Sequence, residues 1–92
     1  MEKGKKYPEK RDIRAIAVLL ATQGMIRLGE IPDPFSGEAA LDRTGATFFI
    51  DLLGELRRKT KGNLDPEEEA FLDDVLENLQ KILKKKAKAK NG

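Results

Sequence analysis

The sequence contains neither cysteine nor histidine. These two absences exclude disulfide bonds, zinc sites of the Cys/His type, thiol nucleophiles and imidazole general bases. Tryptophan is also absent, and the chain has one tyrosine, Tyr7, and one serine, Ser36. Any catalysis would depend on carboxylates, lysines or these two residues. We therefore predict that the protein is not an enzyme and that it uses no cofactor and no metal.

Long apolar runs are also absent. The longest run, Ala15–Ala21, is far shorter than the roughly 20 apolar residues that a membrane-spanning helix needs. Basic residues precede it, as in a secretory signal, but Glu2, Glu9 and Asp12 interrupt them and no small-x-small cleavage site follows. We therefore expect a cytoplasmic protein that makes no membrane contact. The charged content of 37% suits a protein from a thermophile.

Charge is distributed unevenly along the chain. The net charge is +2, but residues 12–83 contain 8 basic and 14 acidic side chains, and the two ends together carry a net charge of +8. This distribution predicts an acidic helical domain at 12–83 between a flexible basic lead-in at 1–11 and a basic tail at 84–92. Such basic ends are mostly solvated, but they can also attract anions such as nucleic acids.

The segment Ala15–Leu28 is apolar in almost every direction when it is wound as a helix. Only Thr22, Gln23 and Arg27 break the pattern in its C-terminal half, apart from Gly24. A helix of this kind is normally buried, because one neighbouring helix covers only one side of it. We therefore predict that the rest of the structure is organised around this segment.

Local signals set the bounds of this first helix. Asp12 is a suitable N-cap, and Gly29 supplies a left-handed residue that ends the helix after Leu28. Gly24 lies inside the helix, where glycine costs about 1 kcal/mol relative to alanine. This cost suggests that another helix approaches closely at Gly24.

Residues 30–38 form a connector that contains two prolines and is not expected to be helical. We predict that it carries the chain across one end of the bundle. In this interpretation Ile31 and Phe35 pack against the bundle end, and Ser36-Gly37 makes a turn.

A second helix is predicted from Asp42 to Thr60, ended by Gly62-Asn63. Its apolar side chains cover roughly 200° of the helical wheel, which is wider than a single core stripe and indicates contact with two partners. The third helix is predicted from Pro66 to Lys85. Asp65 is its N-cap and Glu68 completes a capping-box-like pair.

The third helix carries an amphipathic stripe, and only a short turn separates it from the second helix. These two helices should form an antiparallel hairpin. The predicted fold class is therefore all-α, a three-helix bundle with a proline-rich crossover. The stripe comprises Leu72, Val75, Leu76, Leu79, Ile82 and Leu83.

A chain of 92 residues buries a small fraction of its surface on folding. The first helix is apolar all round and the second has a wide apolar face, so three short helices offer too little cover for both. We therefore predict a homo-oligomer, with a dimer favoured.

Four blocks of the sequence carry a resemblance to a known family. They are Leu-Gly-Glu-Ile-Pro-Asp-Pro at 28–34, Ser-Gly-Glu at 36–38, Ile-Asp-Leu-Leu at 50–53 and Lys-Thr-Lys-Gly-Asn-Leu at 59–64. With these blocks at this spacing, residues 12–79 resemble a family of small bacterial proteins known only as a domain of unknown function. The resemblance implies no activity, cofactor or catalytic residue.

Two groups of residues are candidates for interaction. In the connector, Glu30 and Asp33 with Pro32 and Pro34 could hold a hard cation or act as an acid/base pair. The interpretation we favour is that both carboxylates bond to nearby backbone or to arginine while the prolines set the crossing geometry. The second group is the set of lysines near the C-terminus, which comprises Lys84, Lys85, Lys86, Lys88 and Lys90.

Three hypotheses of function follow. The first is a non-catalytic oligomeric helical protein that holds or regulates a protein partner. The second is an electrostatic accessory that binds nucleic acid or the ribosome weakly through the lysines of the C-terminal tail. The third, which we do not favour, is a carboxylate-based enzyme or metal binder at Glu30 and Asp33.

Overall fold

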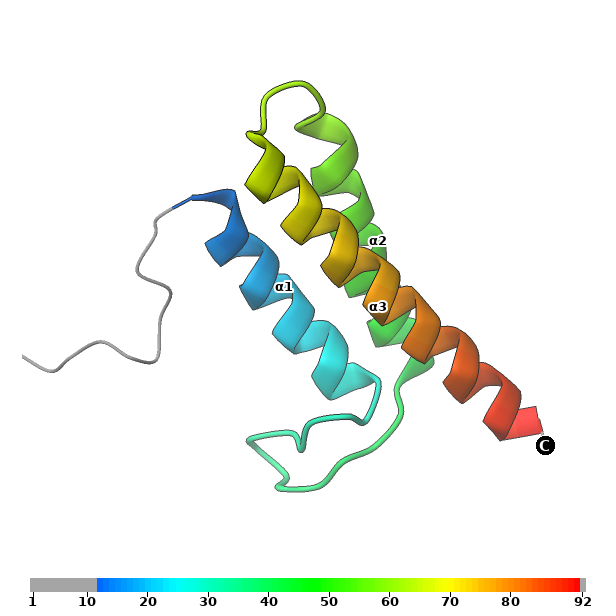
Figure 1. Ribbon diagram of the computed structural model, residues 1–92. Helices are drawn as coiled ribbons and strands as arrows, with labels where there is room; N and C mark the ends of the chain where they lie inside the picture. Colours follow the sequence, from blue (N-terminus) through cyan, green and yellow to red (C-terminus); the bar gives the residue numbers. More distant parts are fainter. Residues whose placement is uncertain (1–11, 92) are drawn as a thin grey trace, which may run out of the picture.

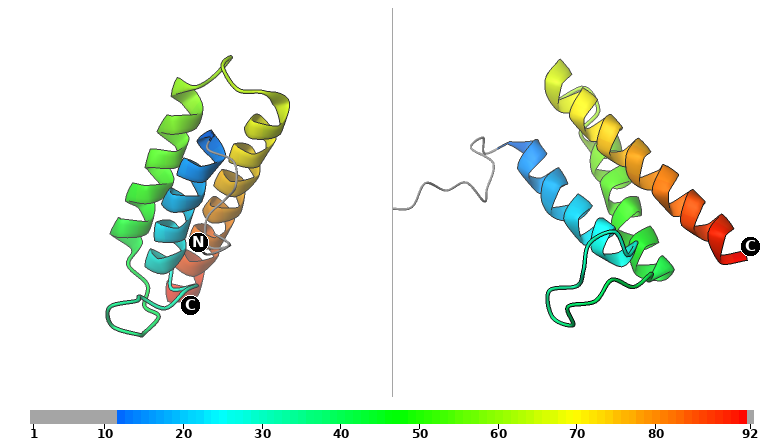
Figure 2. Two further views of the ribbon diagram at one scale, coloured as in Figure 1. Left: turned by 90° about the vertical axis from the view of Figure 1, so that its left-hand side faces the viewer. Right: turned by 60° about the horizontal axis from the view of Figure 1, so that its bottom comes forward.

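The computed structural model describes residues 12–91, and side chains are described for residues 12–88. It contains three helices, α1 (Ile13–Arg27), α2 (Arg43–Lys59) and α3 (Pro66–Asn91), arranged as shown in Figure 1. Helices α2 and α3 form an antiparallel hairpin, and α1 lies over the groove between them (Figure 2). The predicted three-helix bundle is confirmed. The lead-in at residues 1–11 lies outside the described residues.

Aspartate side chains cap all three helices at their first turn. The carboxylate of Asp12 accepts a hydrogen bond from the backbone N–H of Arg14 at 2.9 Å, and that of Asp42 accepts one from Gly45 at 3.0 Å. At α3, Asp65 Oδ1 accepts from the N–H of Glu68 at 2.9 Å, and Glu68 Oε1 accepts from the N–H of Asp65 at 3.0 Å. This reciprocal pair confirms the predicted capping box.

Glycines in the left-handed region follow the first two helices, as predicted. Gly29 has a φ of 81° and Gly62 has a φ of 86°. The end of α3 differs from the prediction, because the helix does not end at Lys85 but continues to Asn91. Lysine and alanine are good helix formers, and cations are favourable near a helix C-terminus. Most of the predicted tail is therefore part of α3.

The core is small and combines residues from all three helices and from the end of α1. From α1, Ala17 and Gly24 are buried, and Ile13, Leu20 and Met25 are partly buried against the core. Leu79 of α3 and Phe49 of α2 both approach Gly24, which confirms that other helices lie close to this position. The buried hydrophobic residues are Ala17, Leu28, Ala46, Ile50, Leu53, Leu72 and Leu79.

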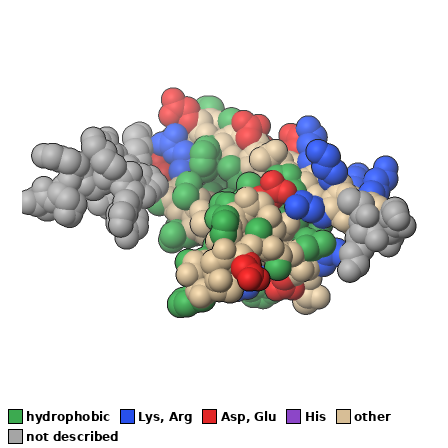
Figure 3. All heavy atoms as spheres, turned by 90° about the horizontal axis from the view of Figure 1, so that it is seen from below, with side chains coloured by type: hydrophobic (Ala, Val, Ile, Leu, Met, Phe, Trp, Pro, Cys, Tyr) green, Lys and Arg blue, Asp and Glu red, His purple; other side chains and the backbone are tan. Residues whose placement is uncertain are grey.

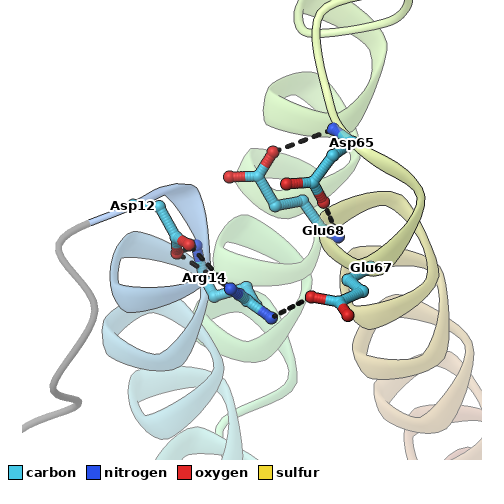
Figure 4. A network of polar contacts seen from close by, with 5 residues as sticks. All are labelled: Asp12, Arg14, Asp65, Glu67 and Glu68. Atoms are coloured by element: carbon cyan, nitrogen blue, oxygen red, sulfur yellow. Dashed lines mark hydrogen bonds and ion pairs between the residues drawn. The ribbon is translucent and has the colours of Figure 1, made fainter.

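Arginine ion pairs join the helices at their surface edges. Arg57 of α2 donates to Asp73 and Glu69 of α3, each at 2.6 Å. Arg14 of α1 pairs with its own N-cap Asp12 at 2.8 Å and with Glu67 of α3 at 3.7 Å (Figure 4). These contacts connect α3 to both of its neighbours.

The connector does not pack as predicted. Phe35 is 98% exposed and Ile31 is also exposed, so the prediction that both pack against the bundle end is wrong. The physical reason is that the loop closes on itself. The N–H of Gly37 donates to the carbonyl of Asp33 at 2.7 Å, and the N–H of Asp33 donates to the carbonyl of Glu38 at 2.9 Å. The connector projects beyond the ends of α1 and α2 (Figure 1), and Phe35 on it is almost wholly in contact with solvent.

The two glycines of the α1 region should respond to alanine in opposite directions. A Cβ at Gly24 would lie 3.7 Å from the Leu79 side chain, an ordinary contact distance. Gly24→Ala should therefore stabilise the fold by about 0.5–1 kcal/mol through helix propensity. Gly29→Ala should destabilise it by about 1–2 kcal/mol, because alanine is strained at positive φ. Urea unfolding measures both changes, and destabilisation by Gly24→Ala would show closer packing at α1 than described.

Candidate interaction site

The side of α1 that points away from α2 and α3 carries large apolar side chains in contact with solvent. Leu19 is 65% exposed and Ile16 is 47% exposed, and Val18 is also exposed. A helix turns by about 100° per residue, which places Leu19 opposite the buried Ala17 and Gly24, with Ile16 and Val18 on the two flanks of that side. We call this surface the outer face of α1, and it comprises Ala15, Ile16, Val18, Leu19, Thr22, Gln23 and Ile26.

The outer face of α1 carries no charged side chain. The two charged residues of the helix, Arg14 and Arg27, lie near its two ends. Arg14 is engaged by Asp12 and Glu67, and the aliphatic part of Arg27 lies close to Gly45 of α2. Both arginines are thus directed toward their own bundle.

Two polar side chains, Thr22 and Gln23, interrupt the outer face. The hydroxyl of Thr22 donates to the carbonyl of Val18 at 2.8 Å. This bond leaves the methyl group of Thr22 as the part available to a partner. The outer face is therefore mainly apolar.

A flank of α2 extends this apolar surface. Phe49 lies against Gly24 of α1, and Phe48 packs edge-to-face on Phe49 with ring centroids 5.2 Å apart. Phe48 is nevertheless 56% exposed, and Leu52, one turn further along α2, is exposed as well. Exposed aromatic and aliphatic groups grouped in this way are typical of binding surfaces.

The structure gives both connector carboxylates local partners. Asp33 Oδ1 accepts a hydrogen bond from the N–H of Phe35 at 2.7 Å, and Glu30 pairs with Lys86 of α3 at 2.9 Å. Among the described residues, no group of three or more acidic side chains could hold a metal ion. The prolines Pro32 and Pro34 are exposed beside Asp33. Asp33 thus organises its own loop, and Glu30 anchors the connector to α3.

The lysines near the C-terminus have different surroundings. Lys84, Lys85 and Lys88 are exposed, whereas Lys86 is half-buried in its pair with Glu30. The side chain of Lys90 lies outside the described residues. Most basic side chains visible in Figure 3 lie toward the C-terminal end of α3. The sequence analysis placed Glu30 and Lys86 in separate candidate groups. It did not predict their ion pair, because no local pattern links residues so far apart in the chain.

Two arginines, Arg14 and Arg57, have a pKa that is shifted from its ordinary value. The hydrogen bond from Arg14 to Asp12 raises the pKa of Arg14, and the hydrogen bond from Arg57 to Asp73 raises the pKa of Arg57. A guanidinium is already charged at neutral pH, so these contacts keep it a cation. Both arginines therefore serve the packing of helices through fixed charge.

Asp33 should act as a hydrogen-bond acceptor and not as a cation ligand. Asp33→Ala removes the acceptor and should increase amide hydrogen exchange at Phe35. Asp33→Asn keeps an acceptor oxygen and should preserve protection. Adding calcium should leave the exchange unchanged in the unaltered protein. Protection that depends on calcium and is lost in Asp33→Asn would instead indicate a cation site.

Each helix within residues 12–91 is too short or too polar to cross a lipid bilayer.

Comparisons with known proteins agree with the resemblance noted above. No curated protein and no solved structure matches the chain. The model of one family, described as a domain of unknown function (DUF1844), matches residues 10–84. Because this match covers most of the chain, the protein belongs to the DUF1844 family.

Proposed function

We propose that this protein is a non-catalytic, homo-oligomeric helical interaction protein whose contact surface is the outer face of α1. The observation that carries the proposal is the exposure of Ile16, Val18 and Leu19 on a helix face without charge. In this role the chain holds or regulates a protein partner through assembly, and no reaction takes place on it.

The energetics of this surface support association. Burial of apolar surface stabilises by about 25 cal/mol per Å², so each large side chain left in water forgoes part of that stabilisation. Scattered apolar residues are normal on soluble proteins, but a contiguous patch marks an interaction site. Leu19 and Ile16 lie one turn apart or less, and the flank at Phe48 and Leu52 lies on the adjacent helix. These residues together form the kind of patch that a second chain covers.

The contacts of the two connector carboxylates, Glu30 and Asp33, also support an interaction role. Asp33 is used by its own loop and Glu30 by Lys86. Each of the two carboxylates is therefore already engaged in structural contacts, and a role as acid/base pair would require both contacts to break.

A charge placed on the outer face of α1 should separate the copies. Leu19→Lys should leave the helix content unchanged, because Leu19 makes few contacts within the monomer, but it should convert the oligomer to a monomer. Thr47→Lys is the matched control, since Thr47 is exposed on α2 on the side away from Phe49, and it should stay oligomeric. Light scattering with circular dichroism tests both. A monomeric unaltered protein at micromolar concentration would remove the proposal.

A second candidate function is favoured by one specific observation. Lysines at i, i+3, i+4 and i+7 share one side of α3 and line a hollow of about 450 Å³. Several cations at this spacing can neutralise adjacent phosphates and give sequence-independent affinity for nucleic acid. The hollow is lined by Asn78, Lys81, Ile82, Lys84, Lys85 and Lys88.

The electrostatic candidate predicts retention on single-stranded RNA at low salt, with loss at physiological salt. Replacing Lys84, Lys85 and Lys88 by alanine should remove this retention without changing the helix content. Leu19→Lys should bind RNA at least as well as the unaltered protein, because it adds a cation. Equal retention of the triple alanine variant would exclude these lysines as the site.

A further inference from the structure

Helix α3 is divided into an acidic half and a basic half. Between Glu67 and Glu77 its charged side chains are all acidic, and from Lys81 onward they are all lysines. The division is wider than the helix dipole requires, since the dipole acts only within the first and last turns. α3 therefore carries opposite charge at the two ends of one long rod.

Two adjacent hollows on α3 repeat this division. They share Asn78 and Lys81, which lie near the middle of the helix. One hollow, of about 520 Å³, is lined on its other side by Phe71, Asp74, Val75 and Glu77. The other, of about 450 Å³, is lined by Ile82, Lys84, Lys85 and Lys88. The charges of the first hollow are acidic apart from the shared Lys81, those of the second are all basic, and both hollows also contain apolar residues.

This surface of α3 is continuous with α1. The two helices run in the same direction, because Arg14 pairs with Glu67 near their N-terminal ends and Gly24 lies against Leu79 further along. Phe71, Val75 and Ile82 are half-buried residues beside the core, on the side of α3 nearer Glu67 and α1. The outer face of α1 and this side of α3 therefore form one two-helix surface, apolar on α1 and charge-divided on α3.

We infer that this two-helix surface docks on the same surface of a second copy, with the helices antiparallel across a two-fold axis that passes near Asn78. This inference rests on the proposed function and names its partner. In such an isologous contact every residue meets the partner's copy of a different residue, except near the axis. The acidic half of α3 then lies against the basic half of the partner's α3, and the last turns of α1, which are level with Asn78 because Gly24 lies against Leu79, meet their own copies.

The charges select this arrangement over a parallel one. A parallel pair would place the acidic residues around Asp74 against their own copies and would place Lys85 against its own copy. Like charges brought together across an interface are strongly unfavourable, whereas complementary potentials fix orientation. The antiparallel pair also gives the exposed lysines an acidic partner, so α3 binds a second copy in preference to nucleic acid.

Single cysteines on α3 test the orientation, because the natural chain contains no cysteine. Asn78→Cys places the thiol near the proposed axis and should form a disulfide-linked dimer under mild oxidation. Ala70→Cys is the matched control on the same helix, where residue 70 is exposed. In the antiparallel pair it lies about 12 Å from the level of the axis, so its two copies are too far apart to link. We expect at least about tenfold more linked dimer for Asn78→Cys than for Ala70→Cys.

Each result is decisive when light scattering is measured on the same variants. Efficient linkage of Ala70→Cys would show a parallel pair and overturn the inference while leaving the proposed function intact. A dimer that links at neither position would show that another surface is used, which also overturns it. A monomeric unaltered protein would remove both proposals. Salt provides an independent check, because added salt should weaken an antiparallel pair and strengthen a parallel one.

Discussion

The rest of this structure depends on the amount of apolar surface that α1 carries. Two neighbouring helices can cover only part of the circumference of a third, and here the buried residues of the helix are the small Ala17 and Gly24, with larger side chains partly buried beside them. Small residues allow α2 and α3 to approach closely, but they leave the bulky Ile16 and Leu19 outside. The bundle thus buries one side of α1 and leaves large apolar side chains on its other side in contact with solvent.

Polar interactions are confined to the ends and seams of the bundle. Aspartates begin each helix, Arg57 connects α2 to α3, and Lys86 holds the connector through Glu30. None of these contacts crosses the outer face of α1. The charges therefore specify how the three helices meet while the surface available to a partner stays free of them. On α3 the opposite holds, since its exposed side is strongly charged and its sign changes along the helix.

Capping signals and periodicity were sufficient to predict the number, type and approximate bounds of the helices, because those features are local. The burial pattern of α1 was not predictable in the same way, since a helix that is apolar all round gives periodicity no preferred side. Phe35 was predicted to pack against the end of the bundle, but hydrogen bonds around Asp33 decide its position. The pair of Glu30 with Lys86 was not predictable, because it joins segments that are distant in the chain. The extension of α3 follows from the helix propensity of lysine and alanine, but the run of lysines was interpreted as a tail.

The loop around Phe35 has a consequence for work with this protein. Its backbone hydrogen bonds run between Asp33 and Glu38, and its tip touches so little that Phe35 is almost wholly in solvent. Changes at the tip are therefore separated from the packing of the bundle. This position is suited to accept a fluorophore, an affinity tag or a grafted peptide, because a label there would leave the packing of the three helices undisturbed.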